Sequence, residues 1–144
     1  MTADKIYQNA SDVRKNWSFT IDTVVHDRPA FINRTRDYVA MLDNQTLLSL
    51  LDNVKYHLEM ETESDGSVTA FLVELELAEN APTKKECISK MIDAMKDYAL
   101  DFYNEFNYWS KAPNRAPHVP YVLKILMSDD NALMEDMVCQ AGKS

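Results

Sequence analysis

The feature that most constrains the fold is a change of hydrophobic spacing within the first fifty residues. After a short extended piece at residues 6–7, apolar side chains recur every three or four positions: Val13, Trp17, Ile21 and Val24. This is the period of an amphipathic helix. Ser11 is expected to cap that helix, because its hydroxyl can accept a hydrogen bond from a first-turn amide, and Pro29 follows its end.

The spacing then changes to that of strands. Residues 30–32 and 38–42 are short apolar runs, and the polar residues 34–37 between them indicate a tight turn. Asp43 or Asn44 is expected to cap a leucine-rich helix that follows. The predicted order in this first segment is β-α-β-β-α.

Alternation begins again at once, with no flexible linker between the two segments. Residues 54–63 alternate between apolar and polar side chains, residues 64–67 have the composition of a hairpin turn, and residues 68–77 are expected to return as one strand. Thr83 and Glu86 form a capping-box pattern at the start of a long amphipathic helix.

We expect this helix to run to about Trp109 and to be followed by a proline-rich loop at residues 112–120. Short helices near residues 121–127 and 131–140 are expected to close the chain. The fold class is therefore α+β, in which a hairpin and a long helix follow the first segment.

Charge divides the chain in the same place. Residues 1–55 carry seven bases and seven acids, whereas residues 56–144 carry eight bases and sixteen acids, which accounts for the whole net charge of −8. An acidic protein binds nucleic acid poorly without a local basic face, because phosphate repels it. Two domains with different tasks are expected, at residues 1–52 and 53–144.

The compartment is inferred from what the sequence lacks. No run of residues reaches the roughly 18 apolar positions that a bilayer requires, and the first twelve residues have no apolar signal core. Cys87 and Cys139 have no metal-site spacing, so we expect two buried, reduced thiols rather than a disulfide or a zinc pair. These features favour a cytoplasmic protein.

Four stretches in the first segment, taken in order, resemble the N-terminal domain of the Phd/YefM antitoxins of type II toxin–antitoxin systems. They are NASDVRKNW at 9–17, VV at 24–25, PAFINR at 29–34 and VAML at 39–42. The resemblance covers roughly residues 6–52. Asn33 stands where the family usually has threonine, and the turn at 34–37 lacks the usual glycine. These departures favour a hairpin of a different shape.

The resemblance implies a homodimer built across the sheet that binds operator DNA. Four bases are candidates for DNA binding: Arg14, Lys15, Arg34 and Arg36. Arg14 and Arg34 match arginines of the family pattern, while the other two are added for their charge alone. Arginine can bind phosphate beside helix amides and can read guanine through two hydrogen bonds. The alternative is that they are solvated surface charges, or form ion pairs with Asp12 and Asp37.

The second segment faintly resembles the HicB antitoxins in its hairpin and helix, and it should fold independently, unlike the short toxin-binding tails usual in Phd/YefM proteins. One aromatic stripe is expected to pack on the sheet: Tyr98, Phe102, Phe106 and Trp109. A partner-binding surface is expected at the remaining aromatics and the loop that follows: Tyr103, Tyr108, Trp109 and Arg115. The acidic residues would complement a basic toxin, or serve only for solubility.

Catalysis has little support in the sequence. His57 could form a site with Glu74 or Glu76 across the hairpin, although such residues more often form a solvated sheet face. Asp129 and Asp130 are better explained as a helix cap than as a metal pair. No catalytic residue, cofactor or metal is therefore expected.

The function that these patterns favour is that of a non-enzymatic antitoxin. It would neutralise a cognate toxin, most plausibly a RelE-like ribonuclease, and would repress its own operon. Two alternatives stay open: a transcriptional regulator whose acidic domain binds a protein other than a toxin, and a small hydrolase that uses His57.

Overall fold

The computed structural model of the chain describes residues 3–141. They form two compact units: a head unit that ends at Leu50 and a body unit that begins at Leu51. Both units combine helices with a small sheet, so the predicted α+β class is confirmed. None of the described helices is both long enough and apolar enough to cross a membrane.

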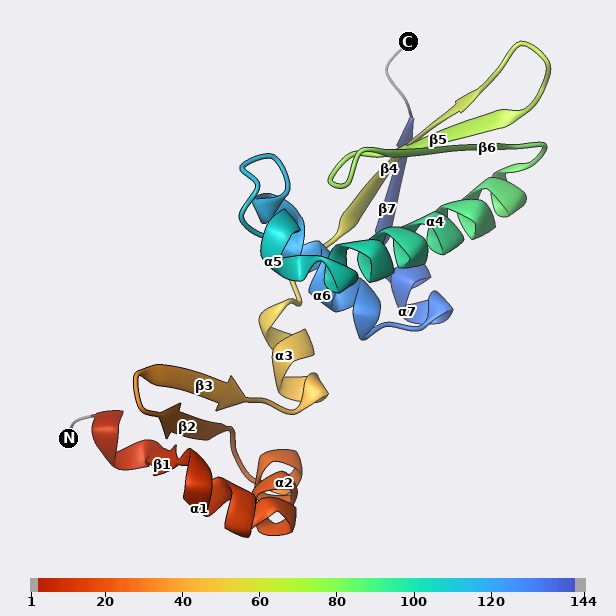
Figure 1. Ribbon diagram of the computed structural model, residues 1–144. Coiled ribbons are helices and arrows are strands. Elements are labelled where there is room, and N and C mark those ends of the chain that lie inside the picture. Colours follow the sequence, from red (N-terminus) through yellow and green to blue (C-terminus); the bar gives the residue numbers. More distant parts are fainter. Residues whose placement is uncertain (1–2, 142–144) are drawn as a thin grey trace. The chain divides into compact units, whose positions relative to one another are not determined.

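The head unit has the predicted order of strands and helices. Its elements are a 3-10 turn Ala3–Ile6, β1 Tyr7–Asn9, α1 Ala10–Lys15, α2 Trp17–His26, β2 Ala30–Arg34, β3 Asp37–Met41 and α3 Asn44–Leu50. The three strands form one sheet in the order β1-β2-β3 (Figure 1). β1 pairs with β2 in parallel, and β3 is antiparallel to β2.

The first helix differs from the prediction at its start and in its middle. Asn9, not Ser11, is the capping residue, and its side-chain oxygen accepts a hydrogen bond of 2.8 Å from the amide of Ser11. The helix is also divided in two at Asn16, whose backbone leaves the helical region at φ −119° and ψ 38°. The amide side chain of Asn16 donates to the carbonyl of Asp12 at 3.1 Å, a local bond that competes with helical pairing.

The hairpin between β2 and β3 closes through residues 35–36, because Arg34 pairs with Asp37 in the register. Thr35 adopts the left-handed conformation, with φ +56°. A β-branched residue is rare there, since its side chain crowds the backbone. The chain thus makes a two-residue turn without the glycine that such turns favour. Asp43 caps α3 as expected: its carboxylate accepts from the amide of Gln45 at 3.1 Å.

The core of the head unit is small. The buried side chains, among those described, are Val13, Thr20, Val24, Ala30 and Ile32. Several large apolar side chains stay exposed instead, and these are Ile6, Trp17, Phe19, Val25, Tyr38, Val39 and Leu50. More large apolar residues are therefore on the surface of this unit than in its interior.

The body unit packs helices on one face of a four-stranded sheet. Its elements are β4 Tyr56–Thr62, β5 Val68–Leu72, β6 Leu77–Ala81, α4 Lys84–Asn104, α5 Phe106–Trp109, a 3-10 turn Ala116–His118, α6 Val119–Leu126, α7 Asp130–Glu135 and β7 Met137–Ala141. The strand order is β6-β5-β4-β7, with β7 parallel to β4. Helix α4 runs along the sheet and contacts β5, β6 and α6 (Figure 1).

The predicted hairpin turn before β5 is confirmed, and so is the Thr83 half of the capping box before α4. Gly66 has φ +87° in the predicted hairpin turn, where Asp65 accepts from the amide of Ser67 at 2.9 Å. Thr83 caps α4, and its hydroxyl accepts from the amide of Glu86 at 3.2 Å.

The prediction of one return strand at residues 68–77 is wrong. The chain turns at residues 73–76 and comes back as β6, with Glu76 at φ +56°. In β5, Leu72 is buried whereas its neighbour Phe71 is exposed. The turn contains no glycine, proline or asparagine, so composition gave no indication of it.

The predicted helix at residues 131–140 is also wrong in its second half. Helix α7 ends at Glu135, and residues 137–141 form β7, which pairs with β4 across about eighty residues of sequence. The long helix ends earlier than expected, at Asn104, with a break at Glu105 before α5. Cys139, which lies in β7, is exposed rather than buried, and both cysteines are free thiols.

The body unit closes a continuous core between α4, α6 and the sheet. Leu58, Leu72, Met91, Met95 and Val122 are among its fully buried side chains. Beside it, the buried ammonium group of Lys124 donates to the carbonyl of Val54 at 2.8 Å and lies 3.1 Å from the carboxylate of Asp136.

Lys55 completes this cluster, since its ammonium group lies 2.8 Å from the same carboxylate. Burial by itself raises the pKa of Asp136, but the hydrogen bonds and charges of the two lysines outweigh burial and hold it below the usual value. The buried ammonium group of Lys124 is thus paired, as a buried charge requires.

Candidate functional site

The four candidate DNA-binding bases are all exposed and lie in two places on the head unit. Arg14 and Lys15 are in the last turn of α1, immediately before Asn16, the N-cap of α2. Arg34 ends β2, and Arg36 is in the hairpin turn. Among residues 3–141, only one of the four bases forms an ion pair: the guanidinium of Arg34 lies 3.4 Å from the carboxylate of Asp37. The alternative pair with Asp12 is not seen there.

One of the two groups, Arg14 with Lys15, lies beside the first backbone amides of α2. Asn16, at the N-cap of α2, makes no side-chain capping bond, so the first amides of that helix have no side-chain partner from the cap. The partial positive charge of a helix N-terminus favours anions. The exposed pair of Arg34 and Asp37 is weak, because solvent screens it. Chemically, both places could hold phosphate.

The edge strand of the head sheet presents apolar side chains to solvent. Tyr38 and Val39 in β3 are 65% and 54% exposed. Tyr38 contacts the ring of Tyr7 edge-on at 5.2 Å, and Phe31 lies 5.7 Å from the same ring. Val39 pairs with Ile32 and faces the other side of the sheet from Tyr38. Exposed apolar residues on both faces of an edge strand are typical of an interaction surface.

The aromatic stripe of the body unit packs as predicted. Phe102 is buried, and Tyr98, Phe106 and Trp109 are partly buried against the same core. Tyr103 and Tyr108 are 60% and 68% exposed, so their expected solvent exposure is also confirmed.

The other two residues predicted to bind a partner are held partly inside the body unit. The guanidinium of Arg115 lies 6.0 Å from the centre of the Tyr98 ring and 3.9 Å from the carboxylate of Glu76. Trp109 is half-buried and meets Tyr108 edge-on, with 4.9 Å between ring centres. The exposed part of the predicted surface is therefore formed mainly by the two tyrosines.

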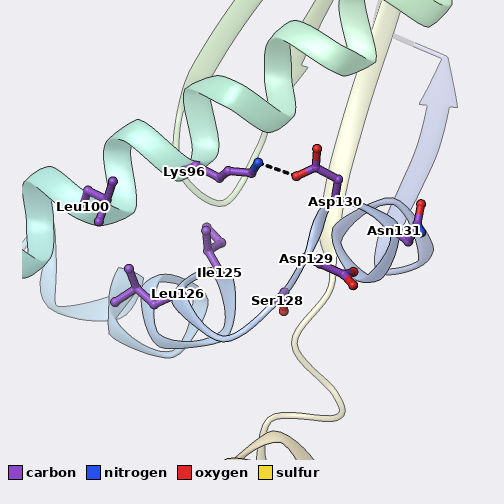
Figure 2. Close-up of a pocket in the computed structure, with 8 residues that line it drawn as sticks. All are labelled: Lys96, Leu100, Ile125, Leu126, Ser128, Asp129, Asp130 and Asn131. Carbon is purple, nitrogen blue, oxygen red and sulfur yellow. Dashed lines mark ion pairs between the residues drawn. The ribbon is translucent and has the colours of Figure 1, made fainter.

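A groove between α4, the end of α6 and the start of α7 was not predicted. Figure 2 shows Ile125 and Leu126 reaching from α6 toward α4, and Lys96 pointing from α4 toward Asp130. The groove encloses about 530 Å³ and is lined by Lys96, Leu100, Ile125, Leu126, Ser128, Asp129, Asp130 and Asn131. Asp130 forms an ion pair with Lys96, which raises the pKa of the lysine. The residues that line the groove lie up to 35 positions apart in the sequence, so no local sequence pattern indicates the groove.

The histidine singled out as a catalytic alternative does meet a carboxylate. His57 Nδ1 lies 2.6 Å from Glu74 Oε2, and the other oxygen of Glu74 accepts from the amide of His57 at 2.7 Å. Glu76 lies instead beside Arg115. Glu74 thus makes hydrogen bonds to both the ring and the backbone of His57. Because His57 lies in β4, these bonds attach the turn between β5 and β6 to that strand.

The structure places the other candidate groups in structural roles. Asp129 caps α7, as expected, by accepting from the amide of Ala132 at 2.8 Å. Within the described part of the chain, no three His, Cys, Asp or Glu side chains gather where a metal ion could bind. Burial raises the pKa of the Cys87 thiol, which makes it less reactive.

A second histidine, His118, is buried. The Nδ1 atom of His118 lies 2.6 Å from the hydroxyl of Tyr98. Burial lowers the pKa of His118, and the nearby charge of Arg115 lowers it further. This pair connects the loop before α6 to α4 and is a structural contact.

The comparisons with known proteins agree with the resemblance found in the sequence. A family model described as "Antitoxin of toxin-antitoxin, RelE / RelB, TA system" (PHD_like) matches residues 5–139. It covers both units, so the folded body unit is part of the family pattern rather than an addition to it. No protein with a curated description matches.

A solved structure is similar over nearly the whole chain. It is the antitoxin part of a proposed toxin/antitoxin system from Syntrophomonas wolfei subsp. wolfei, with 32% sequence identity and a TM-score of 0.85. The similarity covers 94% of this chain and 98% of that chain. On this family match and this structural similarity, the chain belongs to the PHD-like family of antitoxins of toxin–antitoxin systems.

Proposed function

We propose that this antitoxin is a cytoplasmic homodimer with two activities on two units. The body unit binds and neutralises a toxin, a RelE-like ribonuclease, and the head unit binds operator DNA and represses the operon. The observation that carries the proposal is the contrast between a neutral head with exposed bases and apolar residues and an acidic body with its own closed core.

The acidity of the body unit supports a basic toxin as partner. Sixteen acids against eight bases lie in residues 56–144. An enzyme that cleaves RNA needs positive charge to hold the phosphate backbone. An acidic surface covers such a site and also raises the rate of association through long-range attraction.

The exposed apolar residues of the head unit support a homodimer. Tyr38 and Val39 lie on β3, an edge strand of the sheet. A second copy would remove these side chains from water, and each square ångström of apolar surface removed contributes about 25 cal/mol. An unpaired edge strand with apolar side chains is also prone to pair with another chain.

The DNA-binding residues are tested by Arg14→Ala and Arg34→Ala, with Arg28→Ala as a matched control. Arg28 is an exposed arginine of the same unit, beside Asp27. In a gel shift with the upstream DNA, we expect each of the first two changes to abolish the complex, because each removes phosphate or base contacts. Arg28→Ala should leave the protein–DNA complex intact. An unchanged shift in both test variants would contradict the proposed site.

The toxin-binding residues are tested by co-expression with the product of the neighbouring toxin gene. We expect Tyr103→Ala together with Tyr108→Ala to weaken binding and restore growth arrest, since exposed tyrosines are frequent anchors of interfaces. The Arg14→Ala and Arg34→Ala variants should neutralise the toxin normally. Full neutralisation by the double tyrosine variant would show that binding lies elsewhere.

The proposed function involves no catalysis. His57 and Glu74 hold a turn in place, and the proposal requires nothing more of them. His57→Ala should therefore leave both operator binding and toxin neutralisation unchanged. A catalytic activity that is present in the wild-type chain and lost in this variant would favour the hydrolase alternative.

A further inference from the structure

The groove between α4, α6 and α7 has the chemistry of a docking site. We propose that it seats an apolar side chain from a basic segment of the toxin. This inference rests on the proposed function, because it takes the partner to be a basic toxin, and it adds the place at which that toxin is held.

The groove has an apolar floor and an exposed apolar rim. Ile125 is buried at the bottom, and Leu126 is half-buried beside it. Leu100 on α4 is 53% exposed although it lines the same space (Figure 2). A partner side chain placed there would cover Leu100 and rest on Leu126, removing apolar surface from water on both sides. Apolar anchors of this kind in concave sites carry most of the binding energy of interfaces.

The end of the groove at the start of α7 is acidic. Among the described residues that line it, Lys96 is the one base, and its charge is matched by Asp130. Asp129 remains as an additional negative charge.

Helix α4 adds more negative charge next to Leu100. Asp97 and Asp101 are exposed on the neighbouring face of the helix, where they line a separate hollow with Glu79. Their charge acts on an approaching partner at long range rather than by contact inside the groove. A partner with lysine or arginine beside its apolar side chain would therefore be favoured over a neutral or acidic one.

The apolar surface continues along α4 beyond the groove. Tyr103 lies three residues after Leu100, on the same face of the helix, and is also exposed. The groove and the predicted tyrosine surface are thus adjacent on one element. A single partner segment could contact both.

The acidity of the body unit also favours a basic toxin over a second copy of the chain as the occupant of the groove. A second copy of the body unit would bring the same excess of acids to the groove, and like charges placed together oppose association. A basic toxin lacks this repulsion.

The experiment measures binding of the co-purified toxin to the full-length antitoxin by calorimetry. The test variant is Leu100→Lys, which places a positive charge and a polar end in the apolar rim. The control is Phe71→Lys, the same kind of change at an exposed residue whose neighbours Ala70 and Leu72 are buried, so that it lies on the other face of the sheet. Because both residues are exposed, both variants should keep the wild-type melting midpoint, which is checked by circular dichroism.

We expect Leu100→Lys to weaken binding by about 30-fold or more, the effect of losing one anchor residue, while Phe71→Lys binds within threefold of wild type, as a residue outside the interface should. Asp97→Lys with Asp101→Lys should slow association by about tenfold and reduce its salt dependence. Equal affinity of Leu100→Lys and wild type would overturn the inference alone. A wild-type chain that leaves the toxin free would overturn the proposed function as well.

The occupant is checked separately by the size of the free antitoxin. We expect Leu100→Lys to leave the oligomeric state unchanged in sedimentation without toxin. A shift of this variant to a smaller species would mean that a second copy fills the groove, and would overturn the assignment to the toxin.

Discussion

The head and body units solve the problem of burying apolar residues in opposite ways. The body unit covers one face of its sheet with α4 and α6 and fully buries large side chains such as Leu58, Met91 and Met95. In the described part of the head unit, more large apolar residues are exposed than are buried. A chain segment is stable only when burial offsets the entropy lost on folding.

From this difference we expect the head unit, and not the body unit, to depend on a partner for its fold. The body unit has the closed core and paired buried charge of an independent domain. The head unit, with exposed residues on its edge strand, has the composition of half an interface. Stability that depends on association also depends on protein concentration.

The largest expected effect follows from separating the two units. We expect a fragment of residues 51–144 to unfold cooperatively and at the same temperature at any concentration. A fragment of residues 1–50 should lose its structure on dilution, because the proposed dimer would be what covers its apolar surface. Circular dichroism melts over a hundredfold range of concentration would check this. A random-coil spectrum of the larger fragment would contradict it.

The next effect is a cavity in the body core. Leu58→Ala removes a fully buried side chain and should lower the free energy of unfolding by about 3 kcal/mol, within the usual range for such changes. Leu100→Ala, at an exposed leucine, should lower it by less than about 1 kcal/mol. Urea unfolding of both variants provides the comparison, and similar losses in both would mean that the core is assigned wrongly.

A smaller effect is expected from a charge on the head edge strand. Val39→Asp should favour the monomer and lower the melting midpoint of the head unit by several degrees, since a carboxylate in an apolar interface loses its hydration. Gln45→Asp, on exposed α3, adds the same charge as a control. Sedimentation equilibrium distinguishes them. An unchanged dimer in Val39→Asp would place the interface elsewhere.

The smallest effect is a dependence of the body unit on pH. Burial lowers the pKa of His118, so the folded state binds fewer protons than the unfolded state just below the ordinary histidine pKa of about 6.5. The contribution of His118 to stability is therefore fully present above that value. It is lost as pH falls from that value toward the lower pKa of the folded state. The melting midpoint of His118→Gln should change less between pH 7 and pH 5 than that of wild type. Equal slopes would show that His118 does not contribute.

Part of the fold could be predicted because local residues determine it. The hairpin at Gly66 requires a left-handed turn, and the cap at Thr83 requires a hydroxyl next to a free amide. Spacing also indicated the helices and strands of the head unit. These features depend on neighbours a few residues apart.

The rest depends on contacts between distant residues. β7 forms a strand because it pairs with β4, although five residues of mixed composition indicate no strand alone. The turn at residues 73–76 is held by the bonds of Glu74 to His57 rather than by turn-forming residues.

The candidate sites divide in the same way. Solvent exposure of Tyr103 and Tyr108 follows from helical spacing and could be predicted. The groove at Leu100 and Leu126 forms only when α4 and α6 pack together, so its residues show no pattern in the sequence.

The division of tasks between the units is tested most directly by titrating the toxin into the isolated fragment of residues 51–144. We expect an affinity within about threefold of that of the full chain, because the whole proposed toxin interface lies on the body unit. A folded fragment that binds the toxin more than about a hundredfold more weakly than the full chain would contradict this division of tasks.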